Sequence, residues 1–316
     1  MRFSSWLLCL AFLGCATPSH PTPTYEADPN ATTNAGQEEP VANTEPAAPI
    51  GPLRPFLYKV QNSNPPSYLF GTIHVGVSLD EALPGTHFEA LSAPRTVIVE
   101  MDPASVSAQT LADGAVMRRE SLSDMLSGVV WHDLSSELSG VMAVDGLRQM
   151  RPWFAMMMLM QKRVSEMHEG SPPEAMDLSI VNYARRQEIS LVTLERARDQ
   201  IRALNAVPNA QMARVVSEMV EDRAKSDRQL SSMLDVYRSG DEAQMTQLIF
   251  NPEDVHAMPE MYDRLFTRRN RAWLPRIKRE VEEGGAFLAV GLGHLLGEDG
   301  LIALLRLEGF VVERVE

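Results

Sequence analysis

Short apolar runs bounded by polar residues or glycine recur along the chain and predict about six β-strands. Their length and their content of Val, Ile, Leu and Phe are typical of strands that are largely buried in a sheet. Residues 62–66, which separate the first two runs, are turn formers that cannot continue a ladder, so these runs form a predicted hairpin. The predicted strands are residues 56–60, 67–70, 96–100, 190–194, 286–290 and 311–315.

Longer segments with helical spacing lie between these strands. Pro152 splits the longest of them, because a proline inside a helix removes a backbone donor. Strand, helix and strand alternate at both ends, which predicts an α/β fold: a mixed central sheet of about six strands with flanking helices and an inserted helical layer. The predicted helices are residues 84–91, 104–111, 134–167, 177–187, 210–238 and 300–307.

The N-terminus has the features of an export signal followed by a lipid anchor. Arg2 precedes an apolar run at residues 6–13, which has the length of a signal-peptide core and is too short to span a bilayer. Residues 13–16 resemble the lipobox of bacterial lipoproteins, although Phe12 stands where that pattern prefers Leu. The alternative is an ordinary signal peptide that is cut a few residues later.

These features predict three segments. Residues 1–14 form a signal peptide, residues 15–55 a disordered tether lipidated at Cys15, and residues 56–316 the α/β domain. The tether is rich in Pro, Thr, Ala, Asn and Glu and has too few large apolar residues to offset its ordering entropy. We therefore expect a protein held at the cell envelope by its N-terminal lipid. Ala16, where an inner-membrane retention signal would place Asp, favours the outer membrane.

The composition limits which functional groups and partners the protein can use. Cys9 leaves with the signal and Cys15 is acylated, so no thiol remains for a disulfide, a nucleophile or a zinc site. The net charge of −13 argues against nucleic acid as a partner. An Arg-rich stretch at residues 264–279 is a local exception, which a helix face paired with nearby acids also explains. The methionines of residues 156–160 point around a whole helix and are interpreted as core packing rather than as ligands.

Two Gly-x-x-His motifs stand in matching contexts. Gly71 precedes His74 and Gly291 precedes His294, in each case directly after a predicted buried strand. Glycine there permits a turn or a close approach of another group. Ligands of open α/β sheets bind outside the carboxyl ends of the strands, so the two histidines are predicted to meet there.

Two acids occupy comparable positions. Glu100 closes the third predicted strand and Glu195 follows the fourth. Each is either a functional carboxylate at the sheet edge or the first solvated residue after a strand. Two histidines with one or two glutamates, and no cysteine, would suit zinc, manganese or cobalt with an open coordination position. Such an ion lowers the pKa of bound water or polarises a carbonyl.

The chain resembles the TraB/GumN family, to which the TIKI proteins are related. The resemblance rests on the histidines and acids above, together with Arg269, Asn270, Trp273 and the closing sequence of residues 290–301. The resemblance covers nearly all of the chain after the tether. It implies an α/β fold similar to erythromycin esterase-like and ChaN-like proteins, and divalent-metal-dependent proteolysis as in the TIKI branch. Arg268 departs from the pattern, because an acid is expected before the Arg-Asn pair.

The resemblance implies a role for each matching residue. His74, His294 and Glu100 would hold the metal or, without metal, include the general base; Glu195 matches the second family acid. Arg269 would offset charge on a tetrahedral oxyanion, and Asn270 would orient the substrate.

Three functions follow from these roles. The first is a metal-dependent hydrolase, acting as a peptidase on peptides or protein termini at the cell envelope. The second is a surface protein that sequesters a peptide without cutting it, since members of the family are also linked to restraining peptide pheromones. The third is a metal-free hydrolase that uses a histidine to activate water, and chelator sensitivity separates it from the first.

Overall fold

The structure is a computed structural model that describes residues 54–168 and 172–316. The predicted signal peptide, the predicted lipidation site Cys15 and most of the predicted tether lie outside the described residues. Within those two ranges, no helix combines the length and the apolarity needed to cross a bilayer.

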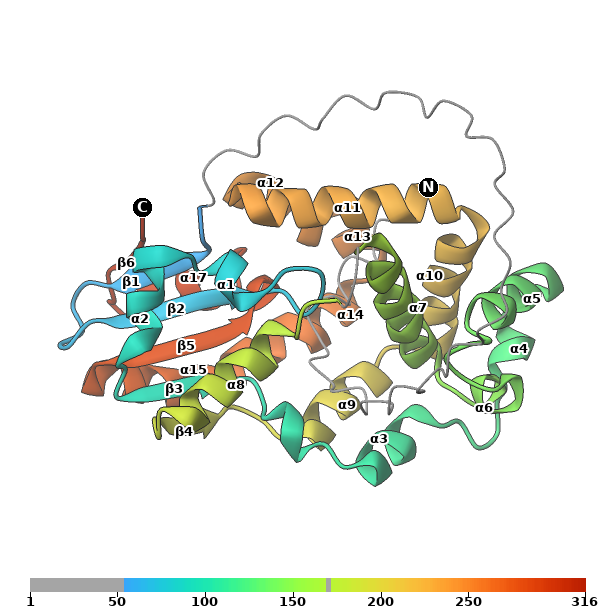
Figure 1. The fold of residues 1–316 in the computed structure, drawn as a ribbon, viewed down its shortest axis with the longest axis horizontal. Helices are drawn as coiled ribbons and strands as arrows, with labels where there is room; N and C mark the ends of the chain where they lie inside the picture. The colour runs from blue at the N-terminus through green and yellow to red at the C-terminus, as the bar shows by residue number, and fades with distance from the viewer. Residues whose placement is uncertain (1–53, 169–171) are drawn as a thin grey trace, which may run out of the picture.

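A six-stranded mixed sheet forms one end of the molecule, on the left of Figure 1. The strand order is β4-β3-β5-β2-β1-β6, in which β2, β5, β3 and β4 run parallel and β1 is antiparallel to both of its neighbours. All six predicted strands are present, and the predicted hairpin is β1 with β2. The bounds are β1 Leu57–Val60, β2 Ser67–Thr72, β3 Thr96–Val99, β4 Ser190–Thr193, β5 Ala286–Gly291 and β6 Val312–Arg314.

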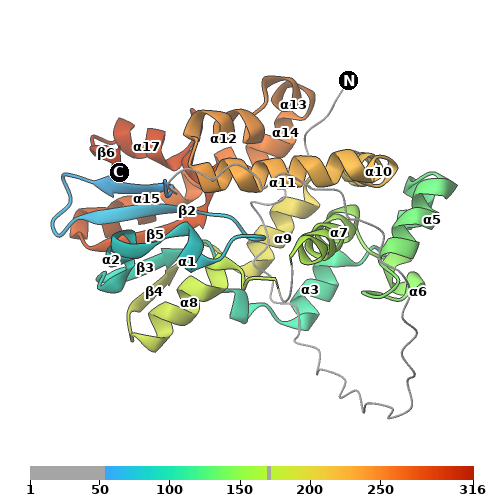
Figure 2. The same ribbon diagram turned by 45° about the horizontal axis from the view of Figure 1, so that its top comes forward.

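Helices cover both faces of the sheet, as the continuous apolar runs predict. All six residues of β5, a central strand, are buried. Helix α8 (Met176–Arg186) packs on one face against β3, β4 and β5, while α15 (Arg268–Glu283) lies on the opposite face with α17 (Leu301–Leu307), as Figures 1 and 2 show. The predicted α/β class, with a mixed sheet and flanking helices, is confirmed.

The predicted helical layer occupies the other end of the molecule, and α11 runs along it toward the sheet (Figure 1). Pro152 opens α7, as predicted. The single helix predicted for residues 210–238 is wrong: Asp222 leaves the helical region with φ −130° and ψ 72°, and its carboxylate caps α11 at the Lys225 amide. The bounds are α3 Ala108–Ala115, α4 Leu122–Met125, α5 Gly128–Glu137, α6 Val144–Arg148, α7 Pro152–Met167, α9 Ala197–Asn205, α10 Asn209–Glu221 and α11 Arg223–Ser239.

Short elements complete the fold. The segment predicted as one helix at residues 84–91 is instead α1, a 3₁₀ turn and α2, and the connection from α11 to α15 contains helices that the sequence pattern did not predict. A π-helix leads directly into α15. These elements are α1 Leu79–Ala82, η2 Gly85–Phe88, α2 Glu89–Ser92, η3 Pro103–Ser105, α12 Glu242–Ile249, α13 Pro252–Ala257, α14 Pro259–Tyr262, η4 Asp263–Thr267 and α16 Leu292–Leu295.

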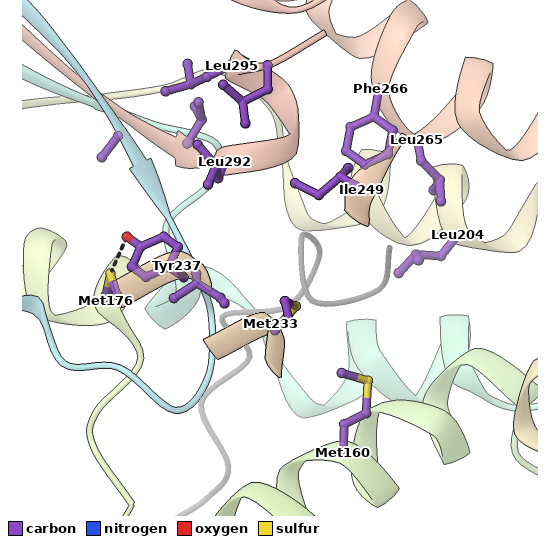
Figure 3. Packing of buried hydrophobic residues seen from close by; sticks show 14 of the residues in the cluster. Met160, Met176, Leu204, Met233, Tyr237, Ile249, Leu265, Phe266, Leu292 and Leu295 are labelled. Carbon is purple, nitrogen blue, oxygen red and sulfur yellow. Dashed lines mark hydrogen bonds between the residues drawn. The ribbon is translucent and has the colours of Figure 1, made fainter. Parts of the chain in front are cut away.

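The hydrophobic core is continuous from the sheet into the helical layer. Figure 3 shows Leu292 and Leu295 of α16 near the sheet, with Met233 and Met160 further into the helical layer. Met156, Met158 and Met160 are all buried there, so these methionines of α7 serve as core packing.

Candidate functional site

The two Gly-x-x-His motifs lie on neighbouring parallel strands. In the register of β2 with β5, Gly71 is opposite Val290 and Thr72 is opposite Gly291. The motifs are therefore side by side and offset by one residue, although more than 200 residues separate them in the sequence. Both histidines leave the sheet at the carboxyl ends of these strands, the edge at which open α/β sheets bind their ligands.

Gly71 is required for a close approach rather than for a turn. A Cβ built on Gly71 would meet Leu292 Cδ1 at 2.4 Å and the Leu292 Cα at 3.3 Å. Leu292 begins α16, the short helix that carries His294, and Figure 3 shows it packed beside β2. The absence of a side chain at Gly71 thus lets the His294 turn lie directly against β2.

His74 forms a buried pair with Asp177. The His74 Nδ1 lies 2.5 Å from Asp177 Oδ2, and the Thr72 hydroxyl donates to Asp177 Oδ1 at 3.1 Å. Asp177 is in the first turn of α8 and is only 6% exposed. Burial acts to raise the pKa of Asp177, but the charge of His74 and the hydrogen bonds from His74 and Thr72 outweigh it and hold that pKa below its usual value. An ionised Asp177 fixes the proton of His74 on Nδ1.

Arg269 connects three of the predicted site residues. Its Nε and Nη2 donate to the two oxygens of Glu195 at 3.1 and 2.6 Å, and Nη2 also donates to Glu100 Oε2 at 2.7 Å. Its Nη1 donates to the Leu265 carbonyl at 3.1 Å and lies 2.9 Å from His294 Nε2. These contacts use all five N–H groups of the guanidinium.

The contacts of His294 define its tautomer. Asn270 Nδ2 donates to two carbonyls, those of His294 and Asp299, at 3.2 and 2.9 Å, which turns Asn270 Oδ1 toward His294 Nδ1 at 2.7 Å. His294 therefore carries its proton on Nδ1 and accepts from Arg269 at Nε2. The ring also packs against Trp273 and Phe266, with centroid separations of 4.5 and 5.2 Å.

Electrostatics keep this cluster in a defined charge state. Burial lowers the pKa of His294 well below its usual value, and the charges of Arg269 and His74 lower it further. The two turns that carry His74 and His294 follow the neighbouring parallel strands β2 and β5. Burial and the charge of Glu100 raise the pKa of Glu195, although Arg269 opposes them. Burial acts to lower the pKa of Arg269, but Glu100 and Glu195 outweigh it, so that pKa is raised.

The structure thus brings five predicted site residues together: Arg269 contacts Glu100, Glu195 and His294, and Asn270 joins them through its contact with His294. The turn that carries His74 follows the neighbouring strand. Gly291 joins them, because its N–H donates to Glu100 Oε1 at 2.8 Å. Arg268, which departs from the family pattern, points away and pairs with Asp263 on the surface.

Asp177 is the site residue that sequence reasoning missed. It stands at the start of a predicted helix, where an acid is expected for capping and for its interaction with the helix dipole, so nothing in its local pattern marked it.

The predicted metal ligands His74, His294 and Glu100 do not fit a metal ion in this arrangement. Both ring nitrogens of His294 are engaged, one by Asn270 and one by Arg269. The Glu100 oxygens accept from Gly291 and from Arg269, so a guanidinium already lies between Glu100 and His294. Within the described ranges, no group of three or more His, Cys, Asp or Glu side chains is arranged to hold a metal.

A comparison with protein families decides the relationship. The profile described as the TraB/PrgY/gumN family matches residues 56–314. The chain belongs to the TraB/PrgY/gumN family. The match runs from β1 to β6 and includes every residue of the cluster around Arg269 as well as His74 and Asp177.

Named relatives are distant. The chain is 24% identical to human "Metalloprotease TIKI1" over 86% of this chain and 64% of the relative, and 22% identical to zebrafish (Danio rerio) "Metalloprotease TIKI2" over 83% of this chain and 61% of the relative. The chain therefore spans less than two thirds of the length of these two relatives. It is also 24% identical to the uncharacterized protein YbaP of Escherichia coli strain K12, over 76% of this chain and 87% of the relative. No solved structure matches the chain at a significant level.

The neutral state of His294 gives this member of the TraB/PrgY/gumN family a specific pH dependence. The pKa of His294 is depressed in the folded state, so below about pH 6.5 the unfolded chain binds a proton that the folded chain does not. The free energy of unfolding should therefore fall as the pH falls below about 6.5, by up to about 1.4 kcal/mol per pH unit from this residue. Urea denaturation at a series of pH values measures it.

His294→Gln should remove this part of the slope, whereas His132→Gln, which changes an exposed histidine on α5, should keep the wild-type slope. A His294→Gln curve parallel to the wild-type curve would show that His294 is not held neutral.

Proposed function

We propose that this protein is a hydrolase of peptides or protein termini in which His74 is the general base. The observation that carries the proposal is the buried pair of His74 with Asp177 at the carboxyl end of β2, next to the cluster around Arg269. Asp177 holds a proton on Nδ1, so Nε2 is the nitrogen that exchanges a proton when His74 acts as a base. The metalloprotease names of the TIKI relatives support a peptide bond as the target.

The reaction then proceeds in two steps. His74 takes a proton from water as the water oxygen attacks the carbonyl carbon, and the ionised Asp177 stabilises the imidazolium that forms. The same imidazolium returns the proton to the departing amine as the C–N bond breaks. The buried positive charge of Arg269 stabilises the negative charge that develops on the carbonyl oxygen. Arg269 does not donate a hydrogen bond to that oxygen in this arrangement, because all its N–H groups are bound by the protein. We therefore assign Arg269 and Asn270 positioning roles.

Glu100 and Glu195 hold the guanidinium in place, and Asn270 holds His294 in its tautomer. A buried, charge-balanced scaffold of this kind keeps the carboxyl ends of β2, β3 and β5 rigid around the reacting groups. We propose that the cell envelope is the place of action, where a lipid on Cys15 would tether the domain within reach of peptides outside the cytoplasm.

A metal-dependent reaction is the second candidate, favoured by the names of the TIKI relatives. Zinc, manganese or cobalt bound by His74, His294 and Glu100 would supply a Lewis acid or an activated water. It would require Arg269 to leave Glu100 and His294. No step above depends on it.

The test uses the full-length protein and a pool of synthetic peptides of varied sequence, with products identified by mass spectrometry. We expect the wild type and His132→Ala to cleave the same peptides and His74→Ala to lose at least about 100-fold in rate. Cleavage that survives exhaustive chelation supports His74 as the base without metal. Loss on chelation that is restored by zinc, manganese or cobalt would overturn the metal-free mechanism. Peptide binding without cleavage under any of these conditions would overturn the hydrolase and favour sequestration.

A further inference from the structure

A cavity lies on the side of His294 away from Arg269. Its volume is about 370 Å³, which is within the range of small-molecule sites. It is formed by α12, α13, α14, the π-helix, the start of α15 and the segment that follows α16. Asn270, which lines it, contacts His294 Nδ1, whereas Arg269 contacts Nε2, so the cavity and the Arg269 cluster lie on opposite sides of one ring.

A single layer of side chains separates the cavity from the His294 ring. Asn270 and Phe266 both line the cavity, and both touch the His294 ring, at 2.7 Å from Nδ1 and at a centroid separation of 5.2 Å. Figure 3 shows Phe266 beside Ile249, near the α16 turn. An occupant of this cavity would therefore press against the two side chains that fix the His294 tautomer.

Three aromatic side chains line the cavity. Phe250, Tyr262 and Phe266 form a mutual cluster with centroid separations of 5.3, 6.0 and 6.2 Å. The Tyr262 hydroxyl donates to the Ile249 carbonyl at 3.1 Å. Aromatic side chains that line a cavity are groups with which proteins bind organic ammonium ions.

The rim of the cavity is acidic. Among the described residues that line the cavity, Glu298 and Asp299, both exposed, are the charged ones, and none is Lys, Arg or His. Asp299 is already engaged, because one oxygen accepts from Arg271 at 3.0 Å and the other from Thr267 at 3.2 Å. Glu298 has no ion pair with any side chain in the described ranges, so its charge remains available to a cationic ligand.

We propose that this cavity is a binding site for a small organic cation, an ammonium group on an apolar or aromatic body. The body would lie among Phe250, Tyr262 and Phe266, where burial of apolar surface and the ring quadrupoles both contribute. The ammonium would lie toward Glu298 at the rim. This site is separate from the proposed peptidase site and does not depend on it, because its binding can be measured in a protein that cleaves nothing.

Three probes of one shape and different charge test the proposal on the full-length protein at neutral pH: phenethylammonium, 2-phenylethanol and 3-phenylpropionate. Titrations followed by ligand-observed NMR should give a dissociation constant about tenfold lower for the ammonium than for the alcohol, and weaker binding still for the carboxylate. Glu298→Gln should reduce the preference for the ammonium, and Glu308→Gln, an exposed acid on the C-terminal side of α17, should not.

Val255→Trp, on α13, would fill the cavity and should abolish binding of all three probes, whereas Val144→Trp places the same bulk at an exposed position on α6 and should not. Equal affinities for the three probes in the wild type, or an unchanged preference in Glu298→Gln, would overturn the cation assignment. Unaltered binding in a folded Val255→Trp would overturn the site itself. If Val255→Trp does not fold, the charge series in Glu298→Gln alone decides the proposal.

Discussion

Asp177→Asn should lower kcat for peptide hydrolysis about 100- to 10,000-fold and change KM little. The Thr72 hydroxyl engages one side-chain oxygen of residue 177, so the new amide nitrogen would face His74 Nδ1. An amide N–H can only donate, which would force the His74 proton onto Nε2 and remove the base. Asp177 is thus a positioning residue that acts through His74. Steady-state kinetics on any peptide that the wild type cleaves would show whether the variant changes kcat, KM or both.

Two comparisons separate this effect from unfolding. Asp133→Asn changes an exposed acid on α5 and should keep wild-type kinetics. Asp177→Asn should keep the far-UV circular dichroism of the wild type, because the hydrogen-bonded contacts of the side chain are preserved in number. Near-normal kcat in a folded Asp177→Asn protein would remove His74 from its role as general base.

Arg269→Met should destabilise the fold by about 3–5 kcal/mol, because it removes the cation that Glu100 and Glu195 share in a buried site. Met approximates the length of the side chain, so packing against Trp273 changes less than the charge does. Urea denaturation of the full-length protein at neutral pH would measure the loss.

The loss in Arg269→Met should shrink as the pH is lowered from about 7 to about 5. Without the guanidinium, burial raises the pKa of Glu195 further than it does in the wild type, so the folded variant takes up protons that the unfolded chain does not. A raised folded-state pKa of an acid gives stability that is present at low pH and is lost as the pH rises. Arg271→Met, an exposed arginine two residues along α15, should cost less than about 1 kcal/mol, as surface ion pairs do. If the difference in the free energy of unfolding between Arg269→Met and the wild type did not change with pH, buried charge would not be the cause of the destabilisation.

The sheet and the meeting of the two turns could be predicted because their signals are local. Continuous apolar runs identify buried strands, and the glycine frames of His74 and His294 mark the carboxyl ends of two of them. The helical layer was predicted less well. Asp222 breaks the predicted helix at residues 210–238 although no glycine or proline is present, and its capping contact depends on its backbone conformation rather than on residue type alone.

The pairing of side chains within the site could not be predicted from the sequence. Arg269 was expected to face the substrate, but the structure engages its N–H groups with Glu195, Glu100, His294 and a backbone carbonyl. Asp177 stands at the start of a predicted helix, where an acid is common without any role in a site. Such pairings arise where strands and helices distant in sequence meet, so the sequence alone does not show that one arginine binds both buried acids.

The position of β5 governs how the molecule can be assembled during synthesis. Residues 286–291 lie between β2 and β3, so until the last 31 residues have emerged, the two strands that carry His74 and Glu100 have no common neighbour. Long-range pairing of this kind folds slowly and leaves strand edges exposed while it waits. A chain truncated before Ala286 would therefore lose more than its C-terminal histidine: it would have no centre to its sheet, and we expect it to be recovered as aggregate or to be degraded rather than as a smaller, partly active protein.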